Sequence, residues 1–401
     1  MAVFTVFNHG TRASRDGEGE IVAEFGRLAA GNEYTDYLIC DGPGSDPKTG
    51  VTPGQFNPYT RDKQAKAIFG NKELGNTRIN CALTGALTGA GWDDNVIHAV
   101  ATIAGLDRLP DTVNMLGWSR GAVTCTKLAV KLREFFPQIA VNIFAVDPVA
   151  GIGNGGDIDT STIPGNVRNY CAVLSMHETR RFFAPQDAQR VAFTDPGTNA
   201  IFIPFPGNHA GQAKLDRNVM KNLGEAAEMA WFLAWRFLDT LGTRFKSVPT
   251  PRYDGLEQCN LYARMKIKMP DYRQTGPGFG SSLFMGGAST RDFVAKHIDH
   301  YVAHANFFIN EHHRRIFRST LPYLYSWIFE GRDVDRAAVI RDFDKTRFYT
   351  GLRRTLVDIG FQAGDPAGVG VTIPPGGSGR QPIWIDRQQV RADMSRMGFH
   401  P

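Results

Sequence analysis

The chain has 401 residues, 42% of them hydrophobic and 21% charged, and a formal net charge of +5. This balance excludes a disordered chain and predicts a sizeable core, in one large domain with an extension or in two domains. The mild excess of positive charge favours contact with anionic surfaces, such as phospholipid headgroups or nucleic acid, without distinguishing between them.

The amino-terminal residues MAVFTVFNHG carry no basic segment ahead of their apolar run, so they predict a strand rather than a secretory signal. Elsewhere, no apolar run approaches the roughly 18–20 residues of a membrane-spanning helix. The five cysteines are scattered and include no CxxC pair. Their spacing argues against a disulfide framework or a zinc site and predicts reduced thiols, as expected after synthesis in the cytoplasm.

Short apolar runs rich in β-branched and aromatic residues recur through the first 243 residues. They are nearly continuous in apolar residues, which is the pattern of strands covered on both faces in a parallel sheet. The predicted strands are Val3–Phe7, Tyr37–Cys40, Thr112–Leu116, Val141–Val146, Tyr170–Ser175 and Ile201–Phe205.

Helical patterns separate these runs. The predicted helices are Trp92–Ala104, Ala122–Phe136 and Lys214–Leu241, and Gly242 stands where a glycine C-cap would end the last of them. Alternating strands and helices predict an α/β fold that is α/β-hydrolase-like and doubly wound, with a mostly parallel sheet.

The alternation of strand-like and helix-like patterns ends at about residue 245. A flexible segment, QTGPGFGSS, precedes a helical stretch rich in histidine and aromatic residues from Arg291 to about Phe317, and a Gly/Pro linker spans Pro374–Pro382. We therefore expect an α/β-hydrolase catalytic domain over residues 1–245. A mainly helical C-terminal region over residues 246–401 would then act as a lid, contact a membrane or pack on the sheet.

The segment NMLGWSRGAV places Ser119 between two glycines, directly after a predicted strand and before a predicted helix. This is the context that the G-x-S-x-G nucleophile elbow requires. Gly117 and Gly121 suit a tight turn where the strand and the helix approach closely, and the helix N-terminus favours developing negative charge. Ser119 is therefore the predicted nucleophile; the alternative is an ordinary serine in a turn.

The acid and the base are expected after later strands, because an α/β-hydrolase orders its triad as Ser, then Asp or Glu, then His. Asp147 follows the strand VNIFAV at the sheet edge where ligands bind, although an Asp before Pro also commonly caps a turn. His209 lies on the loop PGNHA, after the last predicted strand. In the predicted mechanism His209 takes the proton from Ser119 Oγ, and Asp147 supports the imidazolium while an acyl-enzyme forms and is hydrolysed.

Two other histidines compete for the role of base. His98 falls inside a predicted helix, which is typical of an ordinary helical residue. His177 precedes Glu178 and two arginines, a setting better suited to structural ion pairs. Neither follows the last strand of the predicted sheet, so His209 is the better candidate.

The predicted oxyanion hole needs two backbone donors. The first is the N–H of Arg120, the residue after the nucleophile. The second is expected from the loop that follows the first strand, where Gly10 or Thr11 would donate. A plain strand-end turn is the alternative for this loop, and His9 is expected to shape it rather than to act as a second base.

Together these motifs resemble one poorly characterised family of α/β hydrolases, which includes the GxSRGA-type catalytic domains of type VI secretion lipase effectors. The family's elbow, G-F-S-R-G-A, is similar to the stretch from Gly117 to Ala122. The other similar segments, in chain order, are His9-Gly10-Thr11, Asp41-Gly42-Pro43-Gly44, the run from Gly89 to Asn95, Asp147-Pro148-Val149, Glu178-Thr179-Arg180 and Pro206-Gly207-Asn208-His209. The resemblance covers about residues 1–240 and does not reach the C-terminal region.

This resemblance implies hydrolysis of membrane-lipid esters by a phospholipase or related enzyme, often an antibacterial toxin that a cognate immunity protein neutralises. The residues by themselves indicate only a serine acyl hydrolase. One departure is clear, because the family continues after its histidine with an acidic triple-glycine run, whereas here the sequence is Ala210-Gly211-Gln212-Ala213. The shape of the acyl or headgroup pocket is therefore not carried over from the family.

The expected partners are a lipid or other ester substrate, a membrane surface contacted peripherally, and an immunity protein or the secretion machinery. No cofactor is expected, and no recognition motif supports nucleic acid as a partner. Without a signal peptide, the chain would be made in the cytoplasm and exported by a specialised secretion system to act on target-cell membranes. The alternatives are a non-lipid carboxylesterase and a non-catalytic α/β-hydrolase-like binding module.

Three further patterns keep two interpretations each, and no metal site is expected. His297, His300 and His304 would share one helix face, as a metal site or as an ordinary polar face. The loop Asn154–Asp159 could offer oxygen ligands to calcium but lacks the length and terminal Glu of an EF-hand. The aromatic segment Leu321–Phe329 is typical either of a lid or membrane-interface segment or of core packing.

Overall fold

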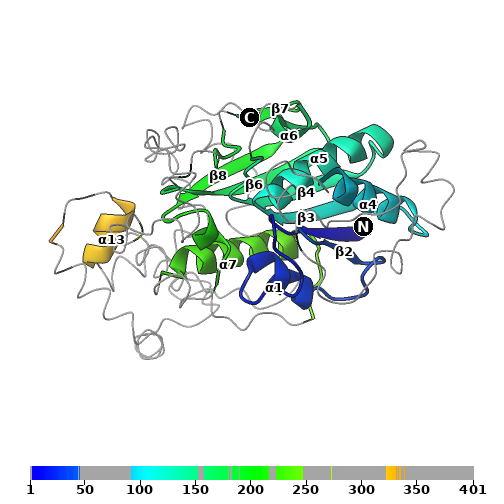
Figure 1. Cartoon of the computed structure of the whole chain (residues 1–401). Helices are drawn as coiled ribbons and strands as arrows, with labels where there is room; N and C mark the ends of the chain where they lie inside the picture. The colour runs from blue at the N-terminus through cyan, green and yellow to red at the C-terminus, as the bar shows by residue number, and fades with distance from the viewer. Residues whose placement is uncertain are drawn as a thin grey trace, which may run out of the picture.

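The computed structural model describes residues 2–43, 45, 92–151, 158–178, 180, 183–188, 190–215, 223–246, 272, 322–330, 332, 334–335 and 338. A sheet of six parallel strands lies at the centre of this part (Figure 1). In sheet order the strands are β2 (Tyr37–Cys40), β1 (Val3–Asn8), β3 (Thr112–Trp118), β4 (Ala140–Val146), β6 (Val167–Ser175) and β8 (Asn199–Phe205). The predicted α/β class is confirmed, with a strand in each of the six predicted places.

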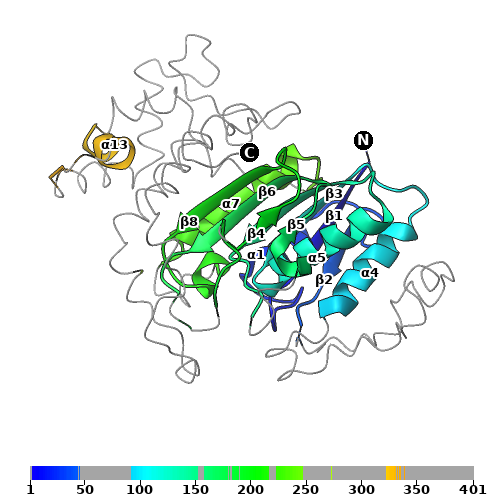
Figure 2. The same ribbon diagram turned by 90° about the horizontal axis from the view of Figure 1, so that it is seen from above.

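Helices cover both faces of this sheet (Figures 1 and 2). One face carries α1 (Ile21–Leu28) and α7 (Glu225–Thr240), and the other carries α4 (Trp92–Ala104), α5 (Arg120–Phe135) and α6 (Ile158–Ser161). The central strands β3, β4 and β6 bury almost every residue, which explains their nearly continuous apolar sequence. The doubly wound arrangement is therefore confirmed.

The strand order reverses between β1 and β3. From β1 the chain runs outward to β2 at one edge, then returns to β3 on the other side of β1 and continues toward β8. In open α/β sheets, ligands bind in the crevice at the carboxyl ends of the strands at such a switch point. Here the segments at that point are the loop after Asn8 and the turn at Ser119.

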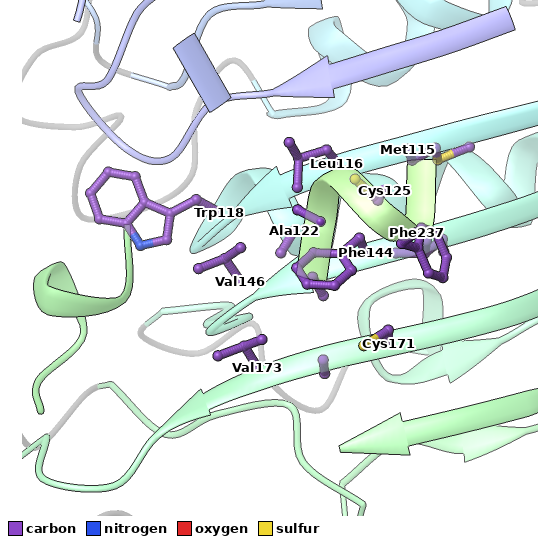
Figure 3. Close-up of a cluster of buried hydrophobic side chains, with 14 of the residues drawn as sticks. Met115, Leu116, Trp118, Ala122, Cys125, Phe144, Val146, Cys171, Val173 and Phe237 are labelled. Carbon is purple, nitrogen blue, oxygen red and sulfur yellow. The ribbon is translucent and has the colours of Figure 1, made fainter. Parts of the chain in front are cut away.

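Apolar side chains fill the space between the sheet and α7 (Figure 3). Phe144 of β4 meets Phe237 of α7 edge to face, with ring centroids 5.6 Å apart. Trp118 projects from the carboxyl end of β3, at the margin of this cluster (Figure 3). Cys40, Cys125 and Cys171 are free thiols buried in the core, in agreement with the prediction of reduced cysteines at these three positions.

A row of polar residues crosses the same face of the sheet near the amino ends of its strands. From β8 to β3, the side-chain amide of Asn199 donates to Asn169 at 3.0 Å, Asn169 donates to Asn142 at 2.7 Å, and Asn142 donates to Asn114 at 2.9 Å. Asn114 donates onward to Thr243 Oγ1 and to the carbonyl of Leu241, each at 3.0 Å. We refer to these four asparagines as the asparagine row.

The structure differs from the predicted elements in the start of α7, in the unpredicted helices α1 and α6, and in one small sheet. The helix expected over Lys214–Leu241 begins at Glu225, because Lys214 instead forms an antiparallel bridge with Glu20. Gly242 does follow its end, with φ of +94°. The sequence patterns did not predict α1, nor the two-residue strands β5 (Thr162–Ile163) and β7 (Ala192–Phe193), which are too short to show a periodicity.

Beyond residue 246 the structure describes few residues. Tyr272 is fully buried in the core of the sheet region, and α13 (Pro322–Phe329) is a short helix in which Tyr323 is 51% exposed and Tyr325 packs partly on the core. Both interpretations of the aromatic segment therefore stay open. The histidines from His297 to His304 and the Pro374–Pro382 linker lie outside the described residues. Within the described ranges, no helix is long and apolar enough to cross a bilayer.

Candidate active site

Ser119 occupies a strained turn between β3 and α5. Its backbone has φ of +58° and ψ of −124°, a conformation that side-chain-bearing residues rarely adopt and that costs about 1–3 kcal/mol. Backbone hydrogen bonds hold it there, since Ser119 N donates to Val146 O at 2.9 Å and Ser119 O accepts from Ala122 N at 3.1 Å. Such strain at a strand-to-helix turn is a feature of the nucleophile elbow.

The two glycines of this turn sit where no side chain fits. A Cβ on Gly117 would lie 2.5 Å from Ala122 N, and a Cβ on Gly121 would lie 2.1 Å from Asn8 O. The first contact reflects the tightness of the turn itself. The second reflects how closely the start of α5 approaches the loop after β1, which is the loop expected to supply an oxyanion donor.

Asp147 and His209, the predicted acid and base, are in contact. Asp147 directly follows β4 with φ of +41° and no exposure, and its Oδ2 lies 2.6 Å from Nδ1 of His209. A carboxylate at Nδ1 favours the tautomer that carries its proton there, so Nε2 is left as the atom that can accept a proton. Sequence reasoning did not find Ser175, whose backbone N–H and hydroxyl each donate to the Asp147 carboxylate at 2.8 Å.

Two aromatic rings flank the His209 imidazole. Trp118 stacks on it with centroids 5.5 Å apart and planes at 29°, and Phe183 meets it edge-on at 5.1 Å. Trp118 is the residue before Ser119, so the imidazole lies against the elbow. No sequence pattern indicated Phe183, which lies on an irregular segment after β6.

Further bonds hold the loop that carries His209. The backbone N–H of Gly207 donates to His177 Nδ1 at 3.0 Å, while His177 N donates to Gly207 O at 2.9 Å. His177 therefore clamps this loop, and the structural ion pair expected beside it forms between Glu178 and Arg180 at 2.8 Å. His98 lies in α4 as predicted, and burial lowers its pKa to about 4.

The loop after β1 packs against the elbow. A Cβ on Gly10 would lie 2.8 Å from Trp118 Cε3, and among the described residues the amides of Gly10 and Thr11 donate to no other group. Arg120 is buried beside this loop, with Nη1 3.4 Å from Thr11 Oγ1 and Nε 3.4 Å from Ala150 O. Burial lowers the pKa of the Arg120 guanidinium.

Side chains behind the loop fix its path. His9 Nδ1 lies 2.9 Å from Glu20 Oε2, and both side chains are buried, although the contact is not aligned as a hydrogen bond. Glu20 also caps α1 by accepting from the amides of Val22 and Ala23 at 3.0 Å each. His9 therefore anchors the loop to α1, consistent with a shaping residue.

The loop is also tied to the segment after β2. Arg15 donates through Nε to Asp41 at 2.9 Å and through Nη1 to both oxygens of Glu33 at 3.1 Å. The backbones meet so closely that a Cβ on Gly42 would collide with Gly10 O. This close approach explains why a glycine follows Asp41, because a residue with a side chain would not fit there.

The candidate calcium loop is described only in its last residues, where Asp159 pairs with Lys127 at 2.7 Å. Among the described side chains, no three His, Cys, Asp or Glu residues gather as metal ligands.

A family model described as a domain of unknown function (DUF5621) matches residues 282–341, and no curated protein matches the chain. Among solved structures, an uncharacterized protein from Pseudomonas aeruginosa is 13% identical with a TM-score of 0.34, over 87% of this chain and 62% of that protein. The chain thus spans less than two thirds of that protein's length. The peroxisomal α/β-hydrolase Lpx1 of Saccharomyces cerevisiae is 11% identical with a TM-score of 0.26, over 68% of this chain and 86% of that enzyme. At these values the matches carry no functional argument.

Proposed function

We propose that this chain is a serine hydrolase of the α/β-hydrolase type that cleaves carboxylic esters of lipids, phospholipids in particular. The observation that carries the proposal is the 2.6 Å contact between His209 Nδ1 and Asp147 Oδ2, on an imidazole that stacks against the residue before Ser119. A buried Asp–His pair beside a strained serine at a helix N-terminus is the arrangement that nucleophilic acyl transfer requires.

The proposed reaction has two halves. His209 Nε2 takes the proton of Ser119 Oγ as the oxygen attacks the ester carbonyl, and it returns that proton to the departing alcohol. Water then attacks the acyl-serine with the same histidine as base, which releases the carboxylic acid and restores Ser119. Asp147 stays ionised and stabilises the imidazolium, aided by the two donors of Ser175.

The oxyanion would be held by the amide of Arg120 and by that of Gly10 or Thr11. The close packing of Gly121 against Asn8 and of Gly10 against Trp118 supports this assignment, because it brings the loop after β1 to the start of α5. Removing one such donor typically costs about 100- to 1,000-fold in turnover.

The choice of lipid rests on the motif resemblance alone. The same resemblance carries the proposals of peripheral membrane contact, an immunity protein, delivery by specialised secretion machinery and action on target-cell membranes. These proposals depend on the resemblance, whereas the proposal of a serine hydrolase depends on contacts within this chain.

A fluorophosphonate probe tests the nucleophile, since it reacts covalently with an activated serine. We expect labelling at Ser119, and loss of both labelling and p-nitrophenyl ester cleavage in Ser119→Ala. Thr35→Ala is the control, because it removes only an exposed hydroxyl whose hydrogen bond to the carbonyl of Asn32 is 3.5 Å long. Undiminished turnover in Ser119→Ala would exclude Ser119 as the nucleophile.

Vesicles of neutral and anionic phospholipid test the substrate class. We expect fatty-acid release that rises with the anionic fraction, because the chain is mildly basic. Cleavage of soluble short-chain esters alone would indicate a non-lipid carboxylesterase. Absence of both labelling and cleavage would indicate a non-catalytic binding module.

A further inference from the structure

A second carboxylate lies behind the loop that carries His209. Glu178 follows β6, is 1% exposed, and accepts the backbone N–H of His209 through Oε2 at 3.0 Å. Its remaining acceptor sites are filled by Arg180, which donates Nε to Oε1, Nη2 to Oε2 and its backbone N–H to Oε1, each at 2.8 Å. A buried carboxylate in this setting is ionised and geometrically fixed.

The same arginine holds an aromatic neighbour of the histidine. The Arg180 guanidinium lies 3.5 Å from the ring centre of Phe183, and the edge of that ring meets the His209 imidazole. Glu178 and Phe183 therefore contact His209 at its backbone and at its ring, and Arg180 joins them into one unit. A unit fixed in this way limits the positions that the imidazole can take.

Charge couples this unit to the imidazole as well. Burial alone would raise the pKa of the Glu178 carboxyl, but the hydrogen bonds and charge of Arg180, together with the charge of His209, lower it. An ionised carboxylate at this position also attracts the positive charge that the imidazole gains in the proposed proton transfer.

The other charged or titratable groups around the histidine come from several elements. Asp147 bonds Nδ1 from β4, Lys214 lies 5.9 Å from the centre of the stacked Trp118 ring, and His177 clamps Gly207. On the far side of the loop, the ring of Tyr272 packs on Gly207 and its hydroxyl donates to Glu225.

We propose that Glu178 is a positioning residue for the general base, fixing the backbone of His209 through one oxygen and holding a negative charge beside the loop that carries the imidazole. The inference rests on the proposed function. Glu178 would thus be a second carboxylate that supports His209. Asp147 contacts the imidazole ring, whereas Glu178 acts through the backbone N–H and through its charge.

Two substitutions separate charge from geometry. Glu178→Gln keeps an oxygen for the His209 N–H but removes the charge, so the acid limb of the pH profile of kcat/KM should move down by roughly 0.5–1 unit. Glu178→Asp keeps the charge but withdraws it by one methylene, so kcat should fall about 10-fold with the acid limb in place. Glu134→Gln is the control, because it breaks the exposed 2.8 Å ion pair with Lys131 and should move neither quantity.

A measurement that needs no turnover keeps this inference separate from the proposed function. In full-length protein with labelled histidine, the NMR titration of the His209 ring should move in Glu178→Gln as the kinetic limb does, with His209→Gln used for assignment. An unmoved titration, or a shift that Glu134→Gln reproduces, would overturn the role of the charge. Wild-type kcat in folded Glu178→Asp would overturn the role of the geometry.

Discussion

The two ends of the sheet use polar residues in opposite ways. At the amino ends, the asparagine row runs from strand to strand, and each amide donates to the next residue in the row or to the segment after α7. At the carboxyl ends, Ser119 and Asp147 sit in strained backbone with φ of +58° and +41°. The side chains of the row bond to one another, whereas the carboxyl edge holds Ser119 and His209, the residues of the proposed reaction.

The amino end of the sheet supports the carboxyl end by setting the register of its strands. Asn114 and Asn142 are register partners, and four residues further along Trp118 pairs with Val146, next to Ser119 and Asp147. A slip of one residue would displace one strand by about 3.3 Å and turn its side chains to the other face. The asparagine row penalises such a slip, because it would leave buried amides without partners. It thereby fixes the relative level of the carboxyl ends of β3 and β4, which Ser119 and Asp147 directly follow.

The largest effect should come from the strained end, with Ser119→Gly. Turnover on a p-nitrophenyl ester should fall by about 10,000-fold or more, because the nucleophile is gone. The free energy of unfolding should rise by about 1 kcal/mol, because glycine adopts this backbone without strain. Urea denaturation measures the second effect, and Ser119→Ala separates it from loss of the hydroxyl. A loss of stability in the glycine variant would mean that the turn is not strained.

A substitution in the asparagine row should have the opposite effect, lowering stability while leaving turnover almost unchanged. Asn142→Ala leaves Asn114 Oδ1 and Asn169 Nδ2 each short of a partner, so the free energy of unfolding should fall by about 4 kcal/mol. Turnover per folded molecule should change little at a temperature where the variant is folded. Asn32→Ala, at an exposed position, serves as the control and should lie within about 0.5 kcal/mol of wild type. If Asn142→Ala costs no more than this control, the row does not set the register.

The loop after β1 should show an intermediate, purely functional effect. Gly10→Ala places a methyl 2.8 Å from Trp118 Cε3, so the loop must shift relative to the elbow. We expect about a 100-fold loss of turnover, equal to the loss of one oxyanion donor. In Gly165→Ala the nearest neighbouring atom is 3.4 Å from the new methyl, and this variant should keep wild-type turnover. Equal rates in the two variants would remove Gly10 from the oxyanion hole.

Sequence alone could predict the strands, because each is covered on both faces and reads as an apolar run. It could also nominate Ser119, Asp147 and His209, because each follows a strand and parallel strands bring their carboxyl ends to one edge. The predicted start of α7, at Lys214, was wrong, because an amphipathic pattern carries no information about the bridge between Lys214 and Glu20.

Other parts of the site left no local signal. In the sequence, Ser175 is an ordinary residue at the end of a strand. Its role becomes visible only in the fold, where β6 lies beside β4 and the Ser175 hydroxyl donates to Asp147. Tyr272 lies 47 residues from Glu225 along the chain, in a region whose texture predicted a separate unit. Its contact shows that the core of the sheet region includes a residue from beyond the predicted boundary at 245, although the boundary itself stays a prediction.

Tyr272 provides the smallest test. Its hydroxyl donates to buried Glu225 at 3.0 Å and accepts from Ala226 N at 3.3 Å, while its ring packs on Gly207 of the histidine loop. Tyr272→Phe keeps the ring and removes both bonds, so the free energy of unfolding should fall by about 2 kcal/mol.

Turnover in Tyr272→Phe should change little, because the contact with Gly207 remains. Tyr323→Phe is the matched control, since that side chain is 51% exposed and its substitution should cost less than about 0.5 kcal/mol. Thermal unfolding of both variants measures the difference. Equal losses would mean that Tyr272 is a peripheral contact, whereas the expected gap would make Tyr272 part of the core that supports the histidine loop.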